Sequence, residues 1–562
     1  MIIVSKLFSN RLLRDIGFLT TAAFLLVLPM IIGGIPSGND LQHHFRFALG
    51  IQEGISNGIV FPTWDAFANQ GFGDAGLRFY PPLSYIFLNV FVGLTNDWYF
   101  GSILTILFFF LVGGIGVYLW ARKWFPGPSA VFGAIVYMSL PYHVNQIYNA
   151  FFYAEFAAAA FVPFCFLIID RISTKPSLVN SLLLGSAYSV VILTHLPTGL
   201  MLSVGLLVYA LLVFGNSGLF QKTLTFVSGI GIGLLLSGFY LIRLMTEVEY
   251  LRHSQTDFTN YDYDFRRNFL LSYFYSRDND YLDRSLWFGD IMLVISLSVA
   301  VPFAFAFFRS KTERTYGPIL AVSGLLIASV FFATPFSSIL WSNIPTLAKI
   351  QFPFRWMGLI TLASAFLVAA GYGPAIEYFR NHQRAKAVLL FALIGLSLSF
   401  TSFQIIRPAI TIEATEFRQF IRSLRKTDSC ECWWPVWAKR EAFQRPERIN
   451  TPDRNSETIK WEPLDREFRV GPGDPVHARI GGFYYPHWKA TVNGDFAVVS
   501  SDDDGSILVE IPSGSASIRL GFEEPFVSRL AVIVSVSTLA FIFILFAFTF
   551  FQSAARIRKA NS

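Results

Sequence analysis

The sequence IPSGNDLQHHFR at residues 35–46 directly follows the first long apolar segment and organises the rest of the chain. It places an acid, two histidines and an arginine within one turn and the start of one helix. A serine or an asparagine before the acid can cap this helix, which predicts Asp40 in its first turn and His43 and His44 three and four residues further on. The helix N-terminus favours the Asp40 anion, which suits a general base or a metal ligand. A solvated loop with a capping acid is the alternative.

The composition indicates a membrane protein. Of the 562 residues, 53% are hydrophobic and 60 are phenylalanine, and the mean hydropathy is +0.48. These values exceed what a soluble core requires, whereas repeated apolar runs of ~20 residues are what a bilayer requires. The net charge of +6 does not indicate nucleic-acid binding, because the basic residues form short clusters between apolar runs, where they set membrane orientation.

The apolar segments predict about twelve transmembrane helices and an uncleaved first helix. Residues 81–94 are apolar but too few to cross, so we expect them to be interfacial or re-entrant. The predicted spans are 16–34, 100–120, 129–140, 151–169, 178–193, 197–214, 224–244, 287–308, 317–332, 354–373, 385–403 and 526–551.

Charge distribution predicts that both termini are cytoplasmic. With that orientation the Lys and Arg clusters between spans lie inside, and the short outer loops 141–150 and 194–196 carry neither residue. We therefore expect a transmembrane domain, an external β-rich domain, and a last helix with a cytoplasmic tail. Their bounds are 1–403 with external loops 35–99 and 245–286, then 404–525, then 526–562. The second external loop is rich in Tyr, Asp and Arg at 261–267 and 275–281.

The external domain has the alternation of a small β-sandwich after a helix at 414–421. Asn493-Gly494 is typical of a hairpin turn. Tyr484, Tyr485 and Trp488 suit either core packing or a sugar-stacking surface. Cys430 and Cys432 are predicted to be free thiols, because four metal ligands are not available nearby. Strands are expected at 477–480, 488–492, 497–499, 507–511 and 517–520.

Six ionisable side chains lie at the outer ends of the predicted spans, and the inner ends carry only ordinary basic anchors. Such groups are costly in lipid and usually face a cavity or a partner. An arginine at a helix end can also extend to the headgroups, and a histidine there can be satisfied locally. Together the six predict an outer cavity for a lipid phosphate, since arginine binds phosphate bidentately. They are Asp40, His143, Glu155, His195, Arg243 and Arg355.

The chain resembles the bacterial family of YfhO-like multi-pass proteins, related to a family labelled 6-pyruvoyl-tetrahydropterin synthase related, membrane protein. The resemblance covers nearly the whole chain. The motifs that carry it are GNDLxxHxR at 38–46, GxxxPxW at 58–64, GFG at 71–73, FYPPL at 79–83, YAE at 153–155, THL at 194–196, FPFR at 352–355, YYPxWKA at 484–490 and VNG at 492–494.

Such proteins are similar to GT-C glycosyltransferases, which take a sugar from a polyprenyl-phosphate carrier at the external membrane face. The resemblance implies a GT-C-like fold with Asp40 as catalytic base or metal ligand. Residue 39 is Asn where paired-acid members have a second acid, so a divalent metal is in doubt, with His43 and His44 as its other possible ligands. From their placement, the proposed substrate-binding residues are His43, His44, Arg78, Tyr80, His143, Glu155, His195, Arg243 and Arg355.

These observations predict an inverting glycosyltransferase of the bacterial inner membrane. It moves a sugar from a polyprenyl-phosphate donor to an external glycan, lipid or protein acceptor, which agrees with the absence of nucleotide-binding motifs in the sequence. A transporter or flippase for a lipid-linked glycan is one alternative, for which we expect polar residues at both membrane faces. A non-catalytic scaffold for envelope assembly, binding through the β domain, is another.

Overall fold

The protein is described here by a computed structural model that covers residues 10–255, 264–272, 280–310, 316–382 and 384–561. The chain forms two compact units. The helical unit comprises Met1–Leu41, Val90–Leu234 and Asn260–Phe417, and the mixed unit comprises Gln42–Asn89, Leu235–Thr259 and Arg418–Ser562. The tyrosine-rich parts of the second predicted external loop, 256–263 and 273–279, lie outside the described residues.

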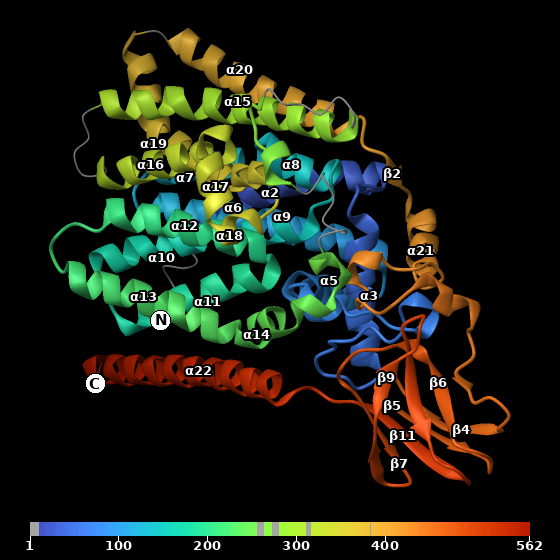
Figure 1. Ribbon diagram of the computed structural model, residues 1–562. Helices are drawn as coiled ribbons and strands as arrows, with labels where there is room; N and C mark the ends of the chain where they lie inside the picture. Colours follow the sequence, from blue (N-terminus) through green and yellow to red (C-terminus); the bar gives the residue numbers. More distant parts are fainter. Residues whose placement is uncertain (1–9, 256–263, 273–279, 311–315, 383, 562) are drawn as a thin grey trace. The chain divides into compact units, whose positions relative to one another are not determined.

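The helical unit is built around α19, a long apolar helix that packs against α7, α15 and α16 (Figure 1). Two short strands, β1 (Ile35–Pro36) and β2 (Thr411–Ile412), pair antiparallel after the first helix. The helices are α2 (Asn10–Gly33), α6 (Trp98–Arg122), α7 (Gly127–Ser139), α8 (Pro141–Tyr148), α9 (Tyr153–Ala159), α10 (Val162–Thr174), α11 (Leu178–Thr194), α12 (Leu196–Val213), α13 (Leu219–Leu236), η5 (Phe265–Arg267), α15 (Asp280–Arg309), α16 (Tyr316–Ala333), η7 (Pro335–Ser337), α17 (Ser338–Asn343), α18 (Pro345–Ala348), η8 (Pro353–Trp356), α19 (Met357–His382) and α20 (Arg384–Ile406).

The predicted membrane class is confirmed, since every one of the twelve apolar segments falls on helix. Within the described residues, nine helical segments are long and apolar enough to cross a bilayer, and three shorter apolar helices accompany them. The segment predicted at 129–140 forms α7, whose 13 residues extend only ~20 Å at 1.5 Å per residue. The helix predicted at 224–244 is interrupted, because α13 ends at Leu236 and α14 begins at Gly238.

The mixed unit combines short helices, nine strands and the last helix. The segment at 81–94 forms the helix α5, and its interfacial placement stays a prediction. The helices are α3 (Leu41–Ser56), η1 (Asn69–Gly71), α4 (Gly76–Phe79), α5 (Leu83–Thr95), α14 (Gly238–Glu247), η2 (Val248–Tyr250), η3 (Arg252–Ser254), α21 (Ala414–Ser423), η9 (Glu431–Trp433), η10 (Arg440–Gln444) and α22 (Phe526–Asn561).

The predicted β-sandwich is confirmed as two antiparallel sheets, with strand orders β3-β6-β10-β9 and β4-β5-β11-β7-β8. Side chains of both sheets share one core, and Trp64 and Phe72 from the segment before α4 enter it. The turn between β7 and β8 has positive φ at Asn493 and Gly494, as a type I′ hairpin requires. The strands are β3 (Ile449–Asn450), β4 (Ser456–Trp461), β5 (Asp465–Val470), β6 (Val476–Phe483), β7 (Trp488–Val492), β8 (Asp495–Ala497), β9 (Val499–Ser501), β10 (Ser506–Ile511) and β11 (Ala516–Phe522).

The prediction of two free thiols in this unit is wrong. Cys430 and Cys432 form a disulfide bond around the short helix η9. The turn brings their Cα atoms to 5.1 Å, which lies within the range that a disulfide spans. The third cysteine, Cys165, is buried and free.

Candidate functional site

Asp40 lies in a loop that backbone contacts hold in place. β1 leads into this loop, the Ser37 amide donates to the Ile410 carbonyl at 2.7 Å, and the Asp40 amide donates to the Ala150 carbonyl at 3.4 Å. A Cβ atom at Gly38 would lie 2.6 Å from the Ala150 backbone, so a glycine is required for this close approach. The helix α3 begins at Leu41, so Asp40 immediately precedes it rather than lying in its first turn.

Glu155 and Arg355 form a buried ion pair in the same unit. Glu155 Oε2 lies 3.2 Å from Arg355 Nε, and Glu155 Oε1 accepts hydrogen bonds from Tyr142 Oη at 2.5 Å and from Gln146 Nε2 at 3.0 Å. Arg355 Nη1 donates to the Ile350 carbonyl at 2.9 Å. The carboxylate therefore has three partners from two segments, α8 and η8, which offsets the cost of burying its charge.

The charges of Glu155 and Arg355 act electrostatically on Asp40. Burial raises the pKa of Asp40 to about 6, while the Arg355 charge lowers it and the Glu155 charge raises it. No hydrogen bond to the Asp40 carboxylate is found among the residues that the structure describes. A half-buried carboxyl group with a pKa near neutrality suits proton transfer.

Two predicted histidines lie in the helical unit near this network. His143 Nδ1 is 2.8 Å from Gln146 Oε1, so Gln146 bridges His143 and Glu155. His195 precedes α12, and its Nδ1 is 2.8 Å from Thr198 Oγ1. A small cavity connects the two regions, because Gln146, Glu155, Thr198 and Arg355 all line it. The helical unit thus brings together five predicted residues, namely Asp40, His143, Glu155, His195 and Arg355.

Arg78 and Arg243 lie in the mixed unit, in a cluster of buried ion pairs. Arg78 Nε is 2.5 Å from Glu247 Oε2, and its Nη1 and Nη2 donate to Glu524 at 2.7 and 2.5 Å. Arg243 Nε lies 3.5 Å from Glu524 Oε2. Both guanidinium groups therefore have carboxylate partners within the unit, and their predicted role in substrate binding stays a prediction.

Glu247 joins this cluster to the β-sandwich. It accepts hydrogen bonds from Tyr485 Oη at 2.9 Å and contacts His487 Nε2 at 3.0 Å. Burial alone would raise the pKa of Glu247, but the contacts with His487 and Arg78 lower it to about 2. Sequence analysis missed both glutamates and His487, because their partners are more than a hundred residues away.

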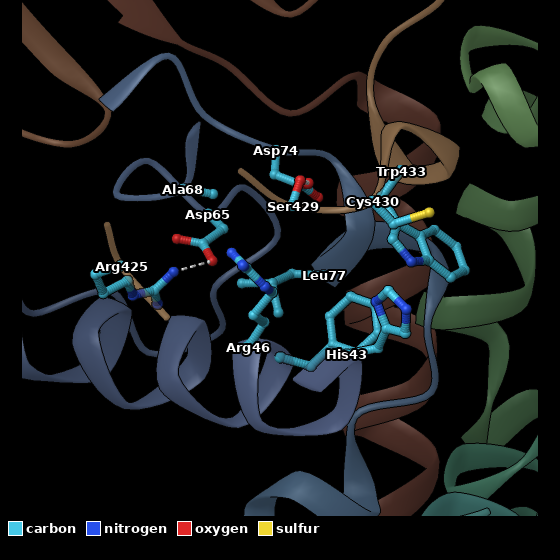
Figure 2. A pocket seen from close by; sticks show the side chains of 11 residues that line it. His43, Arg46, Asp65, Ala68, Asp74, Leu77, Arg425, Ser429, Cys430 and Trp433 are labelled. Atoms are coloured by element: carbon cyan, nitrogen blue, oxygen red, sulfur yellow. Dashed lines mark hydrogen bonds and ion pairs between the residues drawn. The ribbon is translucent and has the colours of Figure 1, made fainter. Parts of the chain in front are cut away.

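His43, His44 and Tyr80 also lie in the mixed unit. His44 is buried, with Nδ1 2.8 Å from Tyr85 Oη, and its ring lies 6.0 Å from that of Tyr80. His43 lines a narrow cavity, which Figure 2 shows together with Arg46, Asp65, Asp74, Arg425 and Trp433.

The charged groups of this cavity are paired with one another or with the backbone. Arg425 pairs with Asp65 at 2.9 Å, and Arg46 Nη1 donates to the Leu424 and Thr427 carbonyls. Burial raises the pKa of Asp74 to about 7 although Ser429 Oγ and the Gly76 amide donate to it. The polar groups of the cavity therefore hold the segment after α21 against the segment that contains Asp65 and Asp74.

The structure offers no ready three-residue metal site. Among the described residues, no group of three or more His, Cys, Asp or Glu side chains is arranged to hold a metal ion. Of the proposed ligands, Asp40 belongs to the helical unit, and His43 and His44 belong to the mixed unit. These residues do not fit a pre-formed metal centre within either unit.

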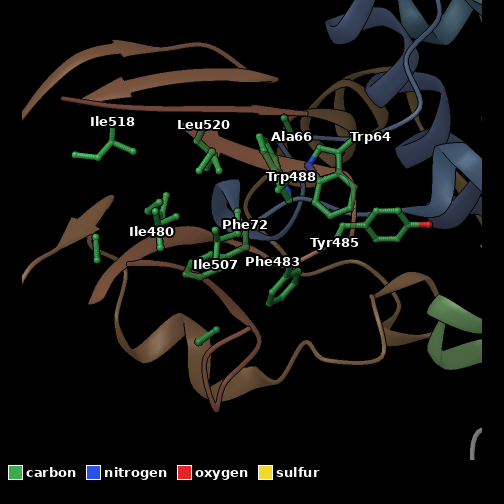
Figure 3. Packing of buried hydrophobic residues seen from close by; sticks show 14 of the residues in the cluster. Trp64, Ala66, Phe72, Ile480, Phe483, Tyr485, Trp488, Ile507, Ile518 and Leu520 are labelled. Atoms are coloured by element: carbon green, nitrogen blue, oxygen red, sulfur yellow. The ribbon is translucent and has the colours of Figure 1, made fainter. Parts of the chain in front are cut away.

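The aromatic residues proposed as a sugar-stacking surface are mostly core residues. Tyr485 and Trp488 are buried, and their rings pack against that of Trp64 at centroid distances of 5.6 and 6.3 Å (Figure 3). Only Tyr484 of the three is half-buried. The stacking alternative is therefore wrong for Tyr485 and Trp488, because side chains buried in the core cannot reach a glycan.

Comparisons with known proteins match the chain to one family, and they also find weaker similarities to a sequence and to solved structures. A model of the family described as "6-pyruvoyl-tetrahydropterin synthase related domain; membrane protein" matches residues 77–406, more than half of the chain. An uncharacterised protein of Lactococcus lactis subsp. cremoris (strain MG1363) is 24% identical over 237 residues, which span 40% of this chain and 38% of that protein.

The fold is also similar to two solved structures at low sequence identity. One is ArnT from Cupriavidus metallidurans bound to undecaprenyl phosphate, with 15% identity, a TM-score of 0.45, and coverage of 74% of this chain and 69% of that one. The other is the archaeal oligosaccharyltransferase AglB from Archaeoglobus fulgidus in complex with an inhibitory peptide and a dolichol-phosphate. It shows 13% identity, a TM-score of 0.36, and coverage of 77% and 59%.

Proposed function

Because the chain belongs to the 6-pyruvoyl-tetrahydropterin synthase-related family of membrane proteins, a name that specifies no reaction, we propose its function from the site itself. We propose a membrane glycosyltransferase that moves a sugar from a polyprenyl-phosphate donor to an acceptor outside the cytoplasm. The observation that supports this proposal most directly is that Asp40 lies beside the buried Glu155–Arg355 pair in one helical unit.

The proposed reaction inverts the anomeric centre in one displacement. The acceptor hydroxyl oxygen attacks the anomeric carbon and forms the new glycosidic bond, while Asp40 takes the hydroxyl proton. The bond between the anomeric carbon and the phosphate oxygen breaks, and the electron pair leaves with the polyprenyl phosphate. A pKa near 6 keeps Asp40 mostly ionised at neutral pH while leaving it basic enough to hold a proton in the transition state.

Arg355 is the group proposed to stabilise the leaving phosphate. A buried guanidinium acts most strongly where charge develops in a site without water. Glu155, fixed by Tyr142 and Gln146, orients that guanidinium in the absence of substrate. His143 and His195 are proposed to contact the sugar or the acceptor, because their partners Gln146 and Thr198 line the same cavity as Glu155 and Arg355.

We further propose that the protein lies in the bacterial inner membrane with both termini cytoplasmic and Asp40 on the outer side. The distribution of basic residues between spans supports this orientation. The Cys430–Cys432 disulfide also supports it, because such bonds persist in oxidising compartments and this segment is predicted to be external.

The test is transfer by purified protein in liposomes. The protein is incubated with radiolabelled polyprenyl-phosphate sugars and membrane glycan acceptors, and released polyprenyl phosphate is measured by mass spectrometry. We expect label in the acceptor, matched release of the carrier, and loss of both in Asp40→Asn. Asp503→Asn makes the same chemical change at an exposed turn and is the matched control. Carrier sugar that crosses the bilayer without being cleaved would contradict transfer and favour the flippase alternative.

A further inference from the structure

Residues 55–61 of the mixed unit expose apolar side chains at the turn after α3. Val60 is 92% exposed, Ile55 is 52% exposed and Phe61 is 37% exposed. Such exposure is unfavourable in water, because removing apolar surface from water is favourable. Single exposed apolar residues are common on ordinary surfaces. Whether this turn contacts lipid therefore depends on where it lies relative to the spanning helices.

The turn is fixed beside two helices of the same unit. The Phe61 ring packs edge-to-face on Phe239 of α14 at 4.9 Å, and the Arg243 guanidinium lies 5.7 Å from the Phe61 ring centroid. Two residues further on, Thr63 Oγ1 donates to Glu524 just before α22 at 2.8 Å. Pro62 sits against Gly54, where an added Cβ atom would lie 2.4 Å from the proline ring.

α14 and α22 lie side by side and run antiparallel, as Figure 1 shows. Two hydrogen bonds set their register. The Phe239 amide donates to Ser535 Oγ at 3.0 Å, and Ser528 Oγ donates to Glu247 at 3.3 Å. Phe239 is therefore level with Ser535, and the end of α14 is level with the beginning of α22.

The pairing of α14 with α22 shows how deep residues 55–61 lie relative to the membrane span of α22. α22 supplies a candidate membrane span from Phe526 to Phe548, with the charged residue Arg529 near its start. Ser535 follows Phe526 by nine residues, or about 13 Å along the axis at 1.5 Å per residue. Thr63, bonded to Glu524, lies at the start of the span. The Phe61 ring lies between the levels of Phe239 and Arg243, so the turn reaches from the headgroup boundary about 7 to 13 Å into the span.

We propose that residues 55–61 form a membrane wedge that inserts into the lipid headgroup–acyl boundary on the side where α22 begins. The occupant of this surface is lipid, because the apolar residues continue the lipid-facing surface of a spanning helix. Arg243 is buried and paired with Glu524, and its guanidinium covers the Phe61 ring from the protein side. Insertion holds the segment leading to Trp64, and with it the base of the β-sandwich, at the membrane surface.

The test uses an environment-sensitive fluorophore in the full-length protein. Val60→Cys is labelled with a nitrobenzoxadiazole probe and reconstituted into phosphatidylethanolamine and phosphatidylglycerol vesicles. Val498→Cys, with a 68% exposed valine between β8 and β9, is the matched control. The native cysteines should not react, because Cys165 is buried and the other two are bonded.

We expect the probe at residue 60 to emit at shorter wavelength than the probe at residue 498. We also expect lipids with a spin label near the headgroup to quench it more strongly than lipids labelled deep in the chain, with neither quenching the control. Equal emission at the two positions, or stronger quenching by the deep label, would overturn the wedge.

Discussion

The Arg355 guanidinium lies 3.2 Å from Glu155, and both side chains are nearly removed from solvent, at 13% and 5% side-chain exposure. A buried pair is weak evidence of stabilisation, because replacing both partners with apolar groups is often neutral. Breaking it by removing one partner leaves an uncompensated charge. In the proposed function, Glu155 keeps Arg355 in place for the leaving phosphate.

Glu155→Gln should destabilise the protein by about 3 kcal/mol, because it leaves Arg355 without its counter-charge in a buried site. The double variant Glu155→Gln/Arg355→Gln should recover part of this loss. The measurement is thermal or denaturant unfolding of the detergent-solubilised protein as a double-mutant cycle. Additive effects of the two substitutions would contradict a direct interaction.

The rate of sugar transfer should rise with pH through about 6 and reach a plateau above it. Burial raises the pKa of Asp40 to about 6, so the carboxylate that accepts a proton is depleted below that pH. The measurement is the pH profile of the initial rate in liposomes at saturating donor. In Asp40→Asn the remaining rate should be low and should not follow this titration. A profile that falls between pH 5 and 7 would exclude Asp40 as the base.

The helices and strands that could be predicted from the sequence are those with a clear hydrophobic periodicity. Most spans and the strands β7, β10 and β11 are apolar at the spacing that their structure requires, so they were predicted close to their bounds. The strand predicted at 497–499 is wrong, because β8 ends at Ala497 and β9 begins at Val499. β5 was missed because Arg466 occupies an inward position. Its guanidinium lies 4.6 Å from the Trp461 ring and 4.9 Å from the Trp488 ring. These two rings stabilise an inward-facing charge at a position where strand alternation would predict an apolar side chain.

The candidate site was predictable only in part. Ionisable residues at the ends of apolar segments are rare enough to single out Asp40, Glu155 and Arg355, and the structure places all three in one unit. Tyr142 and Gln146 were not predicted, although their four-residue spacing puts them on one face of α8 beside Glu155. The pairing of Arg78 with Glu247 and Glu524 depends on long-range folding, about which local sequence says nothing.

Arg78→Met should cost about 4 kcal/mol of unfolding free energy, since it leaves the buried Glu247 and the half-buried Glu524 without their main cation. Arg78→Lys should cost less, because it keeps the charge but loses the bidentate geometry. Unfolding and limited proteolysis of the full chain measure both effects. If Arg78 instead binds substrate, Arg78→Lys should raise KM for the donor while leaving the unfolding midpoint unchanged.

Alkylation should detect one free cysteine before reduction and three after it. In the denatured but unreduced protein only Cys165 is available, because Cys430 and Cys432 are bonded to each other. The bond encloses a very short loop, so in the chain-entropy account it stabilises the fold by only about 2 kcal/mol, and Cys430→Ser/Cys432→Ser should still fold. Mass spectrometry of protein taken from intact cells gives the count directly. Three labels before reduction would mean that this segment carries free thiols, which would remove the disulfide as support for an external location of the β-sandwich.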